Sequence, residues 1–447
     1  MKKDIRRFPR AKLRKAGGIL ETADVVSVFD TEASQADARA FRQLMAHLKE
    51  IDEKTSTVIM VQVENESGLL GDSRDASAGA ERHFHVSVPR DLVKKLSSGY
   101  DSLRPELKHN LRHFDPQNSE GSWPEVFGPS KQTDELFMAY HYALYIERVA
   151  RAGKEAYSLP LYINAWQNFE GSGSANDDDN FPVVVGGGDK PGDYPSGGAV
   201  LSVVDIYQLF APSIALVSPD IYFNDYAATC AAYRHRHQPL LIPEQRRDEH
   251  GARRAWVAFG SHQAIGTSPF AVDTLEPGEN AYKRHYGLLA SVAKFVLKAQ
   301  REGSSIGFFF DEMGADGKDP SPLVNAQFGE WRLRIERSFV FGRAGPGAGM
   351  VIHRGGDTFL LIGWGFGVTF RHERKGWTGI LRFEEKEVVD GGAGLRTLRM
   401  LNGDETRSGA CALMPNEAPD LGDFPICVTI PARTAVAECE VYALEEE

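Results

Sequence analysis

The sequence predicts a parallel α/β domain followed by a smaller β-sandwich-like domain, and two observations support this fold class. Between residues 36 and 300, apolar strand-like runs alternate with segments of helical periodicity, a pattern typical of parallel β/α architecture. From about residue 335 onward the helical periods vanish, and short alternating stretches separated by turn residues favour antiparallel β-structure. We therefore expect one domain over residues 1–330 and another over residues 331–447.

Five apolar runs are expected to form the strands of the parallel sheet. The first, Ser56–Val63, is rich in β-branched residues and directly follows a segment whose apolar residues recur at helical spacing over residues 38–51. The other four runs are separated from one another by helical segments. They are Leu159–Trp166, Ile214–Tyr222, Pro239–Glu244 and Gln263–Phe270.

Helices are expected in the segments between these runs. Thr133 can cap a helix that continues to about Gly153. A short helical piece is expected near residues 89–96, within a long polar insertion over residues 70–132. The remaining helical segments follow the second to fifth strands and lie near residues 201–210, 225–236, 252–260 and 282–301.

Charge and hydropathy restrict the partners and the location of the protein. A net charge of −11 argues against nucleic acid or an anionic membrane surface as the main partner. No apolar run approaches the roughly 18 residues that span a bilayer. The basic N-terminus, MKKDIRRFPRAKLRKAGG, lacks the apolar region of a secretory signal, so we expect a cytoplasmic protein if this N-terminus is the genuine one.

Neither the cysteines nor the histidines predict a metal or redox site. The four cysteines show no CxxC spacing. The pairs His83 with His85 and His235 with His237 each lack a third ligand at a suitable spacing. We therefore expect no metal and no cofactor.

Two of the predicted strands end on glutamate. The run MVQVENESG places Glu64, Asn65 and Glu66 directly after the first strand, and LLIPE places Glu244 at the end of the fourth. A carboxylate is costly to bury unless it is paired or hydrogen-bonded. These residues therefore either close a structural network or line a pocket. If the strands run parallel in a barrel, both tips emerge at the face where barrel enzymes build their active sites.

Two carboxylates that face each other across such a surface suit retaining glycoside hydrolysis. One acts as a general acid that protonates the leaving oxygen and later activates water, while the other attacks the anomeric carbon. The two groups need different environments, so that one stays protonated while the other is ionised. The spacing alone leaves the structural interpretation of the two glutamates open.

Residues 62–68, QVENESG, closely resemble the acid/base motif of family 35 glycoside hydrolases, the β-galactosidases of the large (β/α)₈ clan. The motif is usually QVENEYG, so Ser67 stands in the tyrosine position. The resemblance extends over about residues 20–440 to a bacterial and fungal subgroup with an extra C-terminal domain. The runs that carry it are VENESGLLGDSRD, INAW, GGGDKPGDYPSGG, SPDIYFNDY, IPEQRRD and AIGTSPF.

The resemblance implies a (β/α)₈ TIM-type barrel and assigns roles to three residues. Glu66 would be the acid/base at the end of the fourth barrel strand, and Asn65 would hydrogen-bond the 2-hydroxyl of the sugar. Glu244 would be the nucleophile at the end of the seventh strand. The implied activity is a retaining β-glycosidase of β-galactosidase type, which hydrolyses terminal β-galactosides of an oligosaccharide or glycoconjugate by double displacement.

The strand count agrees with these assignments and also exposes a departure. Two runs lie between those that end at Glu66 and Glu244, and one follows, as expected for strands four to eight. Strands one to three would precede residue 56, where we expect only one helix and a basic tail. The barrel is therefore expected to be incomplete, and the alternative function is a catalytically inactive, truncated carbohydrate-binding relative.

Further candidates for substrate binding lie at the ends of the middle strands. Asn164 and Trp166 end the second predicted run, and an aromatic plane such as Trp166 can stack on the C–H face of a sugar, with core packing as the alternative. Tyr222 ends the third run and can hydrogen-bond the nucleophile, as tyrosines in this clan often do.

Overall fold

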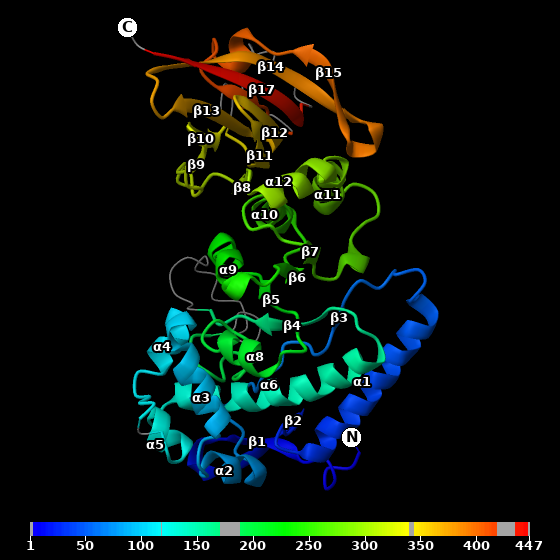
Figure 1. Ribbon diagram of the computed structural model, residues 1–447, viewed down its shortest axis with the longest axis vertical. Helices are drawn as coiled ribbons and strands as arrows, with labels where there is room; N and C mark the ends of the chain where they lie inside the picture. Colours follow the sequence, from blue (N-terminus) through cyan, green and yellow to red (C-terminus); the bar gives the residue numbers. More distant parts are fainter. Residues whose placement is uncertain (1–2, 118, 170–187, 339–343, 418–433, 446–447) are drawn as a thin grey trace. The chain divides into compact units, whose positions relative to one another are not determined.

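The computed structural model describes residues 3–117, 119–169, 188–338, 344–417 and 434–445 (Figure 1). The chain divides into two compact units, Met1–Pro243 and Glu244–Glu447. The domain border expected between residues 330 and 331 stays a prediction, since the division into compact units falls elsewhere in the chain. In the part of the chain that the structure describes, no helix is long and apolar enough to cross a membrane.

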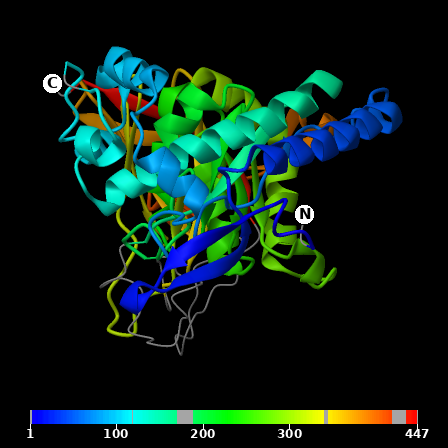
Figure 2. The same ribbon diagram turned by 90° about the horizontal axis from the view of Figure 1, so that it is seen from below.

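The first unit begins with a β-hairpin that the sequence analysis missed. Strands β1 (Arg10–Arg14) and β2 (Leu20–Val26) pair antiparallel and form the dark-blue ribbon of Figure 2. The turn between them passes through Gly17 and Gly18, both at φ +76°, which glycine adopts without strain. The expectation of only a basic tail ahead of the first helix was therefore wrong. The reason is that β1 buries only Ala11 and Leu13. Two buried residues make the alternation of apolar and polar positions too short to identify a strand.

A parallel sheet follows, and its strands lie where the sequence predicts them. In the first unit, β3 (Val61–Gln62), β4 (Leu161–Trp166) and β5 (Leu216–Ile221) are parallel neighbours. Strand β6 (Leu241–Gln245) lies next to β5, and the border between the two units falls within it. Strand β7 (Gly266–Pro269), in the second unit, is the next neighbour of β6.

Strand β3 is much shorter than the predicted run of residues 56–63. The carboxylate of Asp52, at the end of the first helix, accepts hydrogen bonds from the backbone N–H groups of Thr57 at 3.0 Å and Val58 at 2.9 Å. Ser56 has a φ of +52°, so the chain turns there before it enters the sheet. On the side of β3 away from β4, the described residues supply no further strand.

Two long helices, α1 (Thr31–Asp52) and α6 (Lys131–Ala156), pack against each other in the first unit (Figure 1). Phe41 and Met45 of α1 share a core with Val149 and Ala150 of α6. The helix α6 begins earlier than predicted, because Ser130 caps it by accepting a hydrogen bond from the backbone N–H of Thr133 at 3.1 Å. The shorter helices are α2 (Ala78–Phe84), α3 (Arg90–Gly99), α4 (Pro105–Asn110), α5 (Trp123–Phe127), α8 (Val204–Phe210) and α9 (Tyr226–Tyr233).

The described residues of the second unit form three α-helices and two antiparallel sheets. The helices are α10 (Glu249–Gly260), α11 (Ala281–Ser291) and α12 (Ala293–Glu302). The strands of the four-stranded sheet, in spatial order, are β16 (Ala412–Met414), β13 (Phe366–His372), β10 (Trp331–Arg337) and β9 (Val324–Phe328). Those of the six-stranded sheet are β15 (Gly394–Met400), β14 (Trp377–Val389), β17 (Val436–Leu444), β12 (Thr358–Trp364), β11 (Gly347–Gly355) and β8 (Ser305–Phe310).

The two antiparallel sheets enclose a common hydrophobic core, so the expected β-sandwich-like architecture is confirmed. Trp331 and Phe370 of the smaller sheet and Phe359 and Phe383 of the larger one belong to this core. The strands β8 and β9 join the sandwich ahead of its expected start. The other face of the larger sheet packs against the helices, where Trp256 lies in one cluster with residues of β11 and β12.

The close approach of α1 and α6 gives a testable prediction. A Cβ atom on Gly153 would overlap the ring of Phe41, so Gly153→Ala should lower the free energy of unfolding by about 1–3 kcal/mol. Gly287→Ala in α11 is the matched control, because nothing lies within 4 Å of its added Cβ. That change should raise stability by about 0.5–1 kcal/mol. Urea titration of both variants compares them, and equal effects would contradict close packing at Gly153.

Candidate active site

The carboxyl ends of β3, β4 and β5 lie at one edge of the sheet, because the three strands run in the same direction. Each strand carries a polar side chain there: Gln62 ends β3, Asn164 lies in β4 and Asp220 lies in β5. Asn164 and Asp220 are only 2% exposed. A buried polar side chain is stable only when it is hydrogen-bonded, so their partners define the local structure.

The amide of Asn164 is at the centre of this cluster. Its Oδ1 accepts hydrogen bonds from Nε2 of Gln62 at 3.0 Å and from the backbone N–H of Glu66 at 2.8 Å. Its Nδ2 donates to Oδ1 of Asn65 at 3.1 Å and to Oδ2 of Asp220 at 2.8 Å. These four bonds use the full hydrogen-bonding capacity of an amide side chain. The expected role of Asn164 as a substrate contact stays a prediction.

Asn65 is exposed and lies beside this amide. Its Oδ1 accepts from both Nε2 of Gln62, at 3.0 Å, and Nδ2 of Asn164. Its own Nδ2 has no recorded acceptor among the residues that the structure describes. Because the side-chain carbonyl of Asn65 is held by two donors, its amide NH2 group points away from them. This NH2 group can reach a ligand hydroxyl. This geometry suits the role that the sequence predicts for Asn65.

Glu66 is half-buried and has an unusual backbone. Its φ of +44° lies in the left-handed region, which favours glycine. A carboxylate oxygen of Glu66 lies within 4.8 Å of one of Asp220. The chain then turns at Gly68, where φ is +147° and a Cβ would lie 2.5 Å from Pro195, so only glycine fits. Glu66 is therefore held between a hydrogen-bonded strand end and a tight turn.

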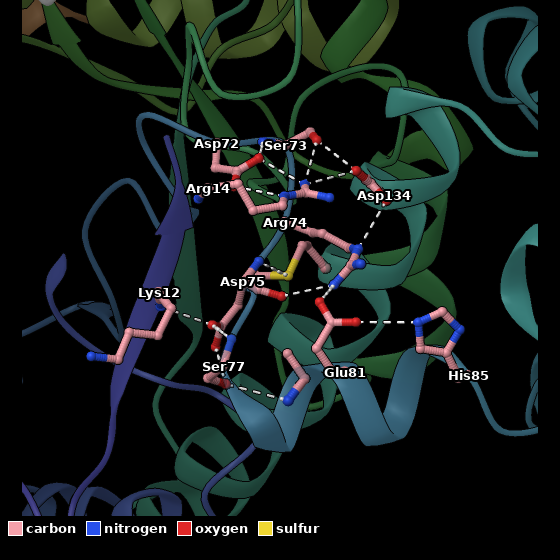
Figure 3. A network of polar contacts seen from close by, with 12 residues as sticks. Lys12, Arg14, Asp72, Ser73, Arg74, Asp75, Ser77, Glu81, His85 and Asp134 are labelled. Atoms are coloured by element: carbon pink, nitrogen blue, oxygen red, sulfur yellow. Dashed lines mark hydrogen bonds and ion pairs between the residues drawn. The ribbon is translucent and has the colours of Figure 1, made fainter. Parts of the chain in front are cut away.

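The loop that follows Glu66 is tied to the hairpin and to α6 by ion pairs (Figure 3). Arg14 of β1 pairs with Asp72 at 2.7 Å and with Asp134 of α6 at 3.1 Å. Asp134 also accepts from Oγ of Ser73 at 2.6 Å and pairs with Arg74 at 3.2 Å. Burial raises the pKa of Asp72, but the hydrogen bonds from Arg14 outweigh it and hold the pKa below its ordinary value.

The carboxylate of Asp75 also holds the loop that follows Glu66. Asp75 accepts from the backbone N–H of Lys12 at 2.9 Å and from that of Ser77 at 2.7 Å (Figure 3). Its other oxygen accepts from Oγ of Ser27 at 2.6 Å. The hairpin is thus bonded to residues 72–77 along its length. This network could not be predicted from local sequence patterns, because its partners are up to 120 positions apart.

Glu64 contacts the amide cluster through its backbone, whose oxygen accepts a hydrogen bond from Nε2 of Gln62 at 3.3 Å. Burial and the negative charge of Asp37 on α1 raise the pKa of its carboxyl group to about 7.

The other predicted residues also lie at strand ends. Trp166 is half-buried, ends β4 and is the register partner of Asp220. Tyr222 directly follows β5, and Glu244 is half-buried in β6. Their roles in binding and catalysis, like those of Glu66 and Asn65, stay predictions.

Gln62 is the network residue that the sequence reasoning missed, although its place within the QVENESG run was a usable signal.

A hollow of about 380 Å³ lies elsewhere in the first unit. The hairpin and the start of α2 form it, and its charged lining residues are Arg10, Lys12, Asp30 and Arg82. None of the predicted site residues lines it.

Comparisons with known proteins find one domain family and several solved structures. Residues 282–412 match the model of a domain of unknown function (DUF5597). The chain is also similar to the crystal structure of a β-galactosidase from the psychrophilic Marinomonas ef1, with 14% identity, a TM-score of 0.39, and coverage of 67% of this chain and 48% of that chain. A β-galactosidase from Bacillus circulans sp. alkalophilus gives 14% identity and a TM-score of 0.35, over 68% of this chain and 44% of that chain.

The chain spans less than half the length of these two β-galactosidase structures. With TM-scores below 0.5, neither match carries an argument about function. No curated protein matches the chain.

The left-handed backbone of Glu66 gives a prediction about stability. An L-residue other than glycine loses about 1–2 kcal/mol in this region, so Glu66→Gly should be more stable than Glu66→Ala by about 1 kcal/mol. Thermal or urea unfolding measures the difference. The neighbouring Ser67 does not have a positive φ, so the order should reverse there. Ser67→Ala should be more stable than Ser67→Gly. The same order at both positions would contradict the strain at Glu66.

The raised pKa of Glu64 gives a prediction about pH. The folded protein binds a proton at Glu64 more tightly than the unfolded chain, so this residue reduces stability as pH rises from about 4.5 to about 7. Glu64→Gln should therefore raise the free energy of unfolding at pH 8 by roughly 2–3 kcal/mol and change it little at pH 4. Asp24→Asn, at an exposed position on β2, is the control and should show no such dependence.

Proposed function

We propose that this chain carries the site of a retaining β-glycosidase, of β-galactosidase type, that acts on terminal β-galactosides. Glu66 is the acid/base and Glu244 the nucleophile. Asn65 donates a hydrogen bond to the 2-hydroxyl of the sugar, and Trp166 and Tyr222 complete the binding surface. The reaction needs no cofactor.

The observation that carries the proposal is the arrangement of Asn65 and Glu66 at the carboxyl end of β3. Both follow the tip of β3, beside the tips of β4 and β5, and the carboxyl ends of parallel strands are where barrel enzymes build their active sites. The amine of Asn65 is available to a ligand, while its carbonyl is held by Gln62 and Asn164. An amide donor next to a half-buried glutamate provides both recognition and proton transfer.

The proposed reaction proceeds by two displacements. The Glu244 carboxylate attacks the anomeric carbon while Glu66 donates its proton to the glycosidic oxygen, so the aglycone leaves as an alcohol. Glu66, now a carboxylate, then takes a proton from water, and the hydroxide attacks the same carbon to release Glu244. Two inversions give net retention of configuration.

A second candidate function is carbohydrate binding without hydrolysis. The observation in its favour is the open side of β3, where the described part of the chain adds no strand. Loops from neighbouring strands normally form part of the wall of a barrel site. A site that lacks part of this wall can keep its sugar contacts and lose the alignment that hydrolysis requires.

Release of nitrophenol from an aryl β-D-galactoside tests the proposal. Glu244→Gln should lower kcat by at least 10⁴-fold with any leaving group, since the glycosyl-enzyme cannot form. Glu66→Gln should lower kcat/KM by about 10²–10⁴-fold with the nitrophenyl substrate and much less with the dinitrophenyl substrate, whose aglycone leaves without a proton. Glu64→Gln is the matched control at a neighbouring glutamate and should keep its turnover.

Azide separates the two roles. In Glu66→Ala, azide should intercept the glycosyl-enzyme and yield the β-galactosyl azide. In Glu244→Ala, it should occupy the place of the nucleophile and yield the α-galactosyl azide. Near-normal turnover in both Gln variants would overturn the proposal. Binding of galactose by calorimetry, with no turnover in the folded wild-type chain, would establish the binding function instead.

A further inference from the structure

The backbone of Glu66 is in a conformation that needs support from outside. A glutamate at φ +44° is strained, and such a residue persists only where its surroundings hold it. One contact that holds it is the hydrogen bond from its backbone N–H to Oδ1 of Asn164, at 2.8 Å. The orientation of the Asn164 amide decides whether this hydrogen bond can form.

An amide side chain has two orientations of almost the same shape, with oxygen and nitrogen exchanged. In the observed one, Nδ2 of Asn164 faces the carboxylate of Asp220, and Oδ1 faces the two donors on Glu66 and Gln62. In the exchanged orientation, Nδ2 of Asn164 would face the donors on Glu66 and Gln62, and its carbonyl oxygen would face the carboxylate of Asp220. An ionised carboxylate only accepts hydrogen bonds, so Asp220 excludes the exchanged orientation.

The sheet places Asp220 so that it can have this effect. Asn164 of β4 is in register with Ser218 of β5, so Asp220 is two positions further along on the same face. Both side chains are 2% exposed, and water cannot replace either partner without opening the site. A buried hydrogen bond to a charged group is about twice as strong as one between neutral groups.

We propose that Asp220 is a positioning residue: through the amide of Asn164 it fixes the left-handed backbone of Glu66 and so aims the Glu66 carboxyl group beside the amine of Asn65. In this arrangement Asn164 is a relay in the protein and not a substrate contact. The effect of Asp220 on catalysis rests on the proposed function. The hydrogen bonds that link Asp220 to Glu66 through Asn164 are independent of that function.

An exchange of the two side chains is the sharpest test. Asn164→Asp alone places two carboxylates against each other and should disrupt the chain. Adding Asp220→Asn restores a donor opposite an acceptor, because the amine at position 220 can donate to the carboxylate at 164. That carboxylate can still accept from Glu66 and Gln62. Ser218→Ala is the control, since Ser218 is fully buried on the same strand and lies outside the network.

Two readouts follow each variant. The first is kcat and KM with the aryl β-galactoside: Asp220→Ala and Asn164→Asp should lower kcat about 10²-fold with KM within a factor of three, because misplacement affects the reacting group more than ground-state binding. The double variant should recover to within tenfold of wild type. The second is hydrogen exchange of the Glu66 amide, measured by NMR with ¹⁵N-glutamate, which should be at least tenfold faster in the single variants and slow again in the double variant.

The outcomes separate the two proposals. Wild-type kcat and slow Glu66 exchange in a folded Asp220→Ala variant would overturn the positioning role. A folded double variant without recovery in either readout would overturn it as well. If wild type shows no turnover, or Glu66→Gln keeps it, the proposed function fails, and hydrogen exchange alone decides whether Asp220 holds Glu66.

Discussion

The structure of the site depends on one constraint, the burial of the Asn164 amide. A buried amide must satisfy two donor and two acceptor positions at once, and here they are met by groups from the ends of two neighbouring strands and the loop after one of them. This is possible in only one register of the strands. A shift by one residue would turn Asn164 to the opposite face of the sheet and leave its partners without bonds. The register of the strands therefore determines the geometry of the site.

The hairpin at the start of the chain extends this constraint. Residues 66–77 leave the sheet after β3, and such a loop would be mobile without further support. The ion pairs of Arg14 with Asp72 and Asp134, and the hydrogen bonds of Asp75, fasten it to the hairpin and to α6 (Figure 3). Partly buried ion pairs of this kind contribute little net stability, because desolvation offsets their attraction. Their effect is to select one path for the chain, and this path begins at Glu66.

The sequence predicted those features that depend on local pattern. Strands β4 to β7 and the long helix α6 carry clear periodicity, and the glutamates were found because charged residues stand out at the end of an apolar run. Strand β3 was predicted too long, since no local signal shows that Asp52 binds the backbone of Thr57 and Val58. The role of Gln62 in the network was missed for another reason. Its hydrogen bond to Asn164 depends on which strands become neighbours and in which register.

The backbone of Glu66 also bears on the choice between hydrolysis and simple binding. Several other residues have a positive φ. Ser56 lies just beyond α1, Arg236 and His237 follow α9, and Ala271 and Asp390 follow the strands β7 and β14. Glu66 also follows a strand, and among these residues it is the one proposed as the acid. Hydroxyl groups of a sugar can be recognised by relaxed side chains, so binding alone does not require a strained glutamate. The proposed hydrolysis requires an acid at one place relative to the glycosidic oxygen, and a strained backbone that Asn164 supports is consistent with that requirement.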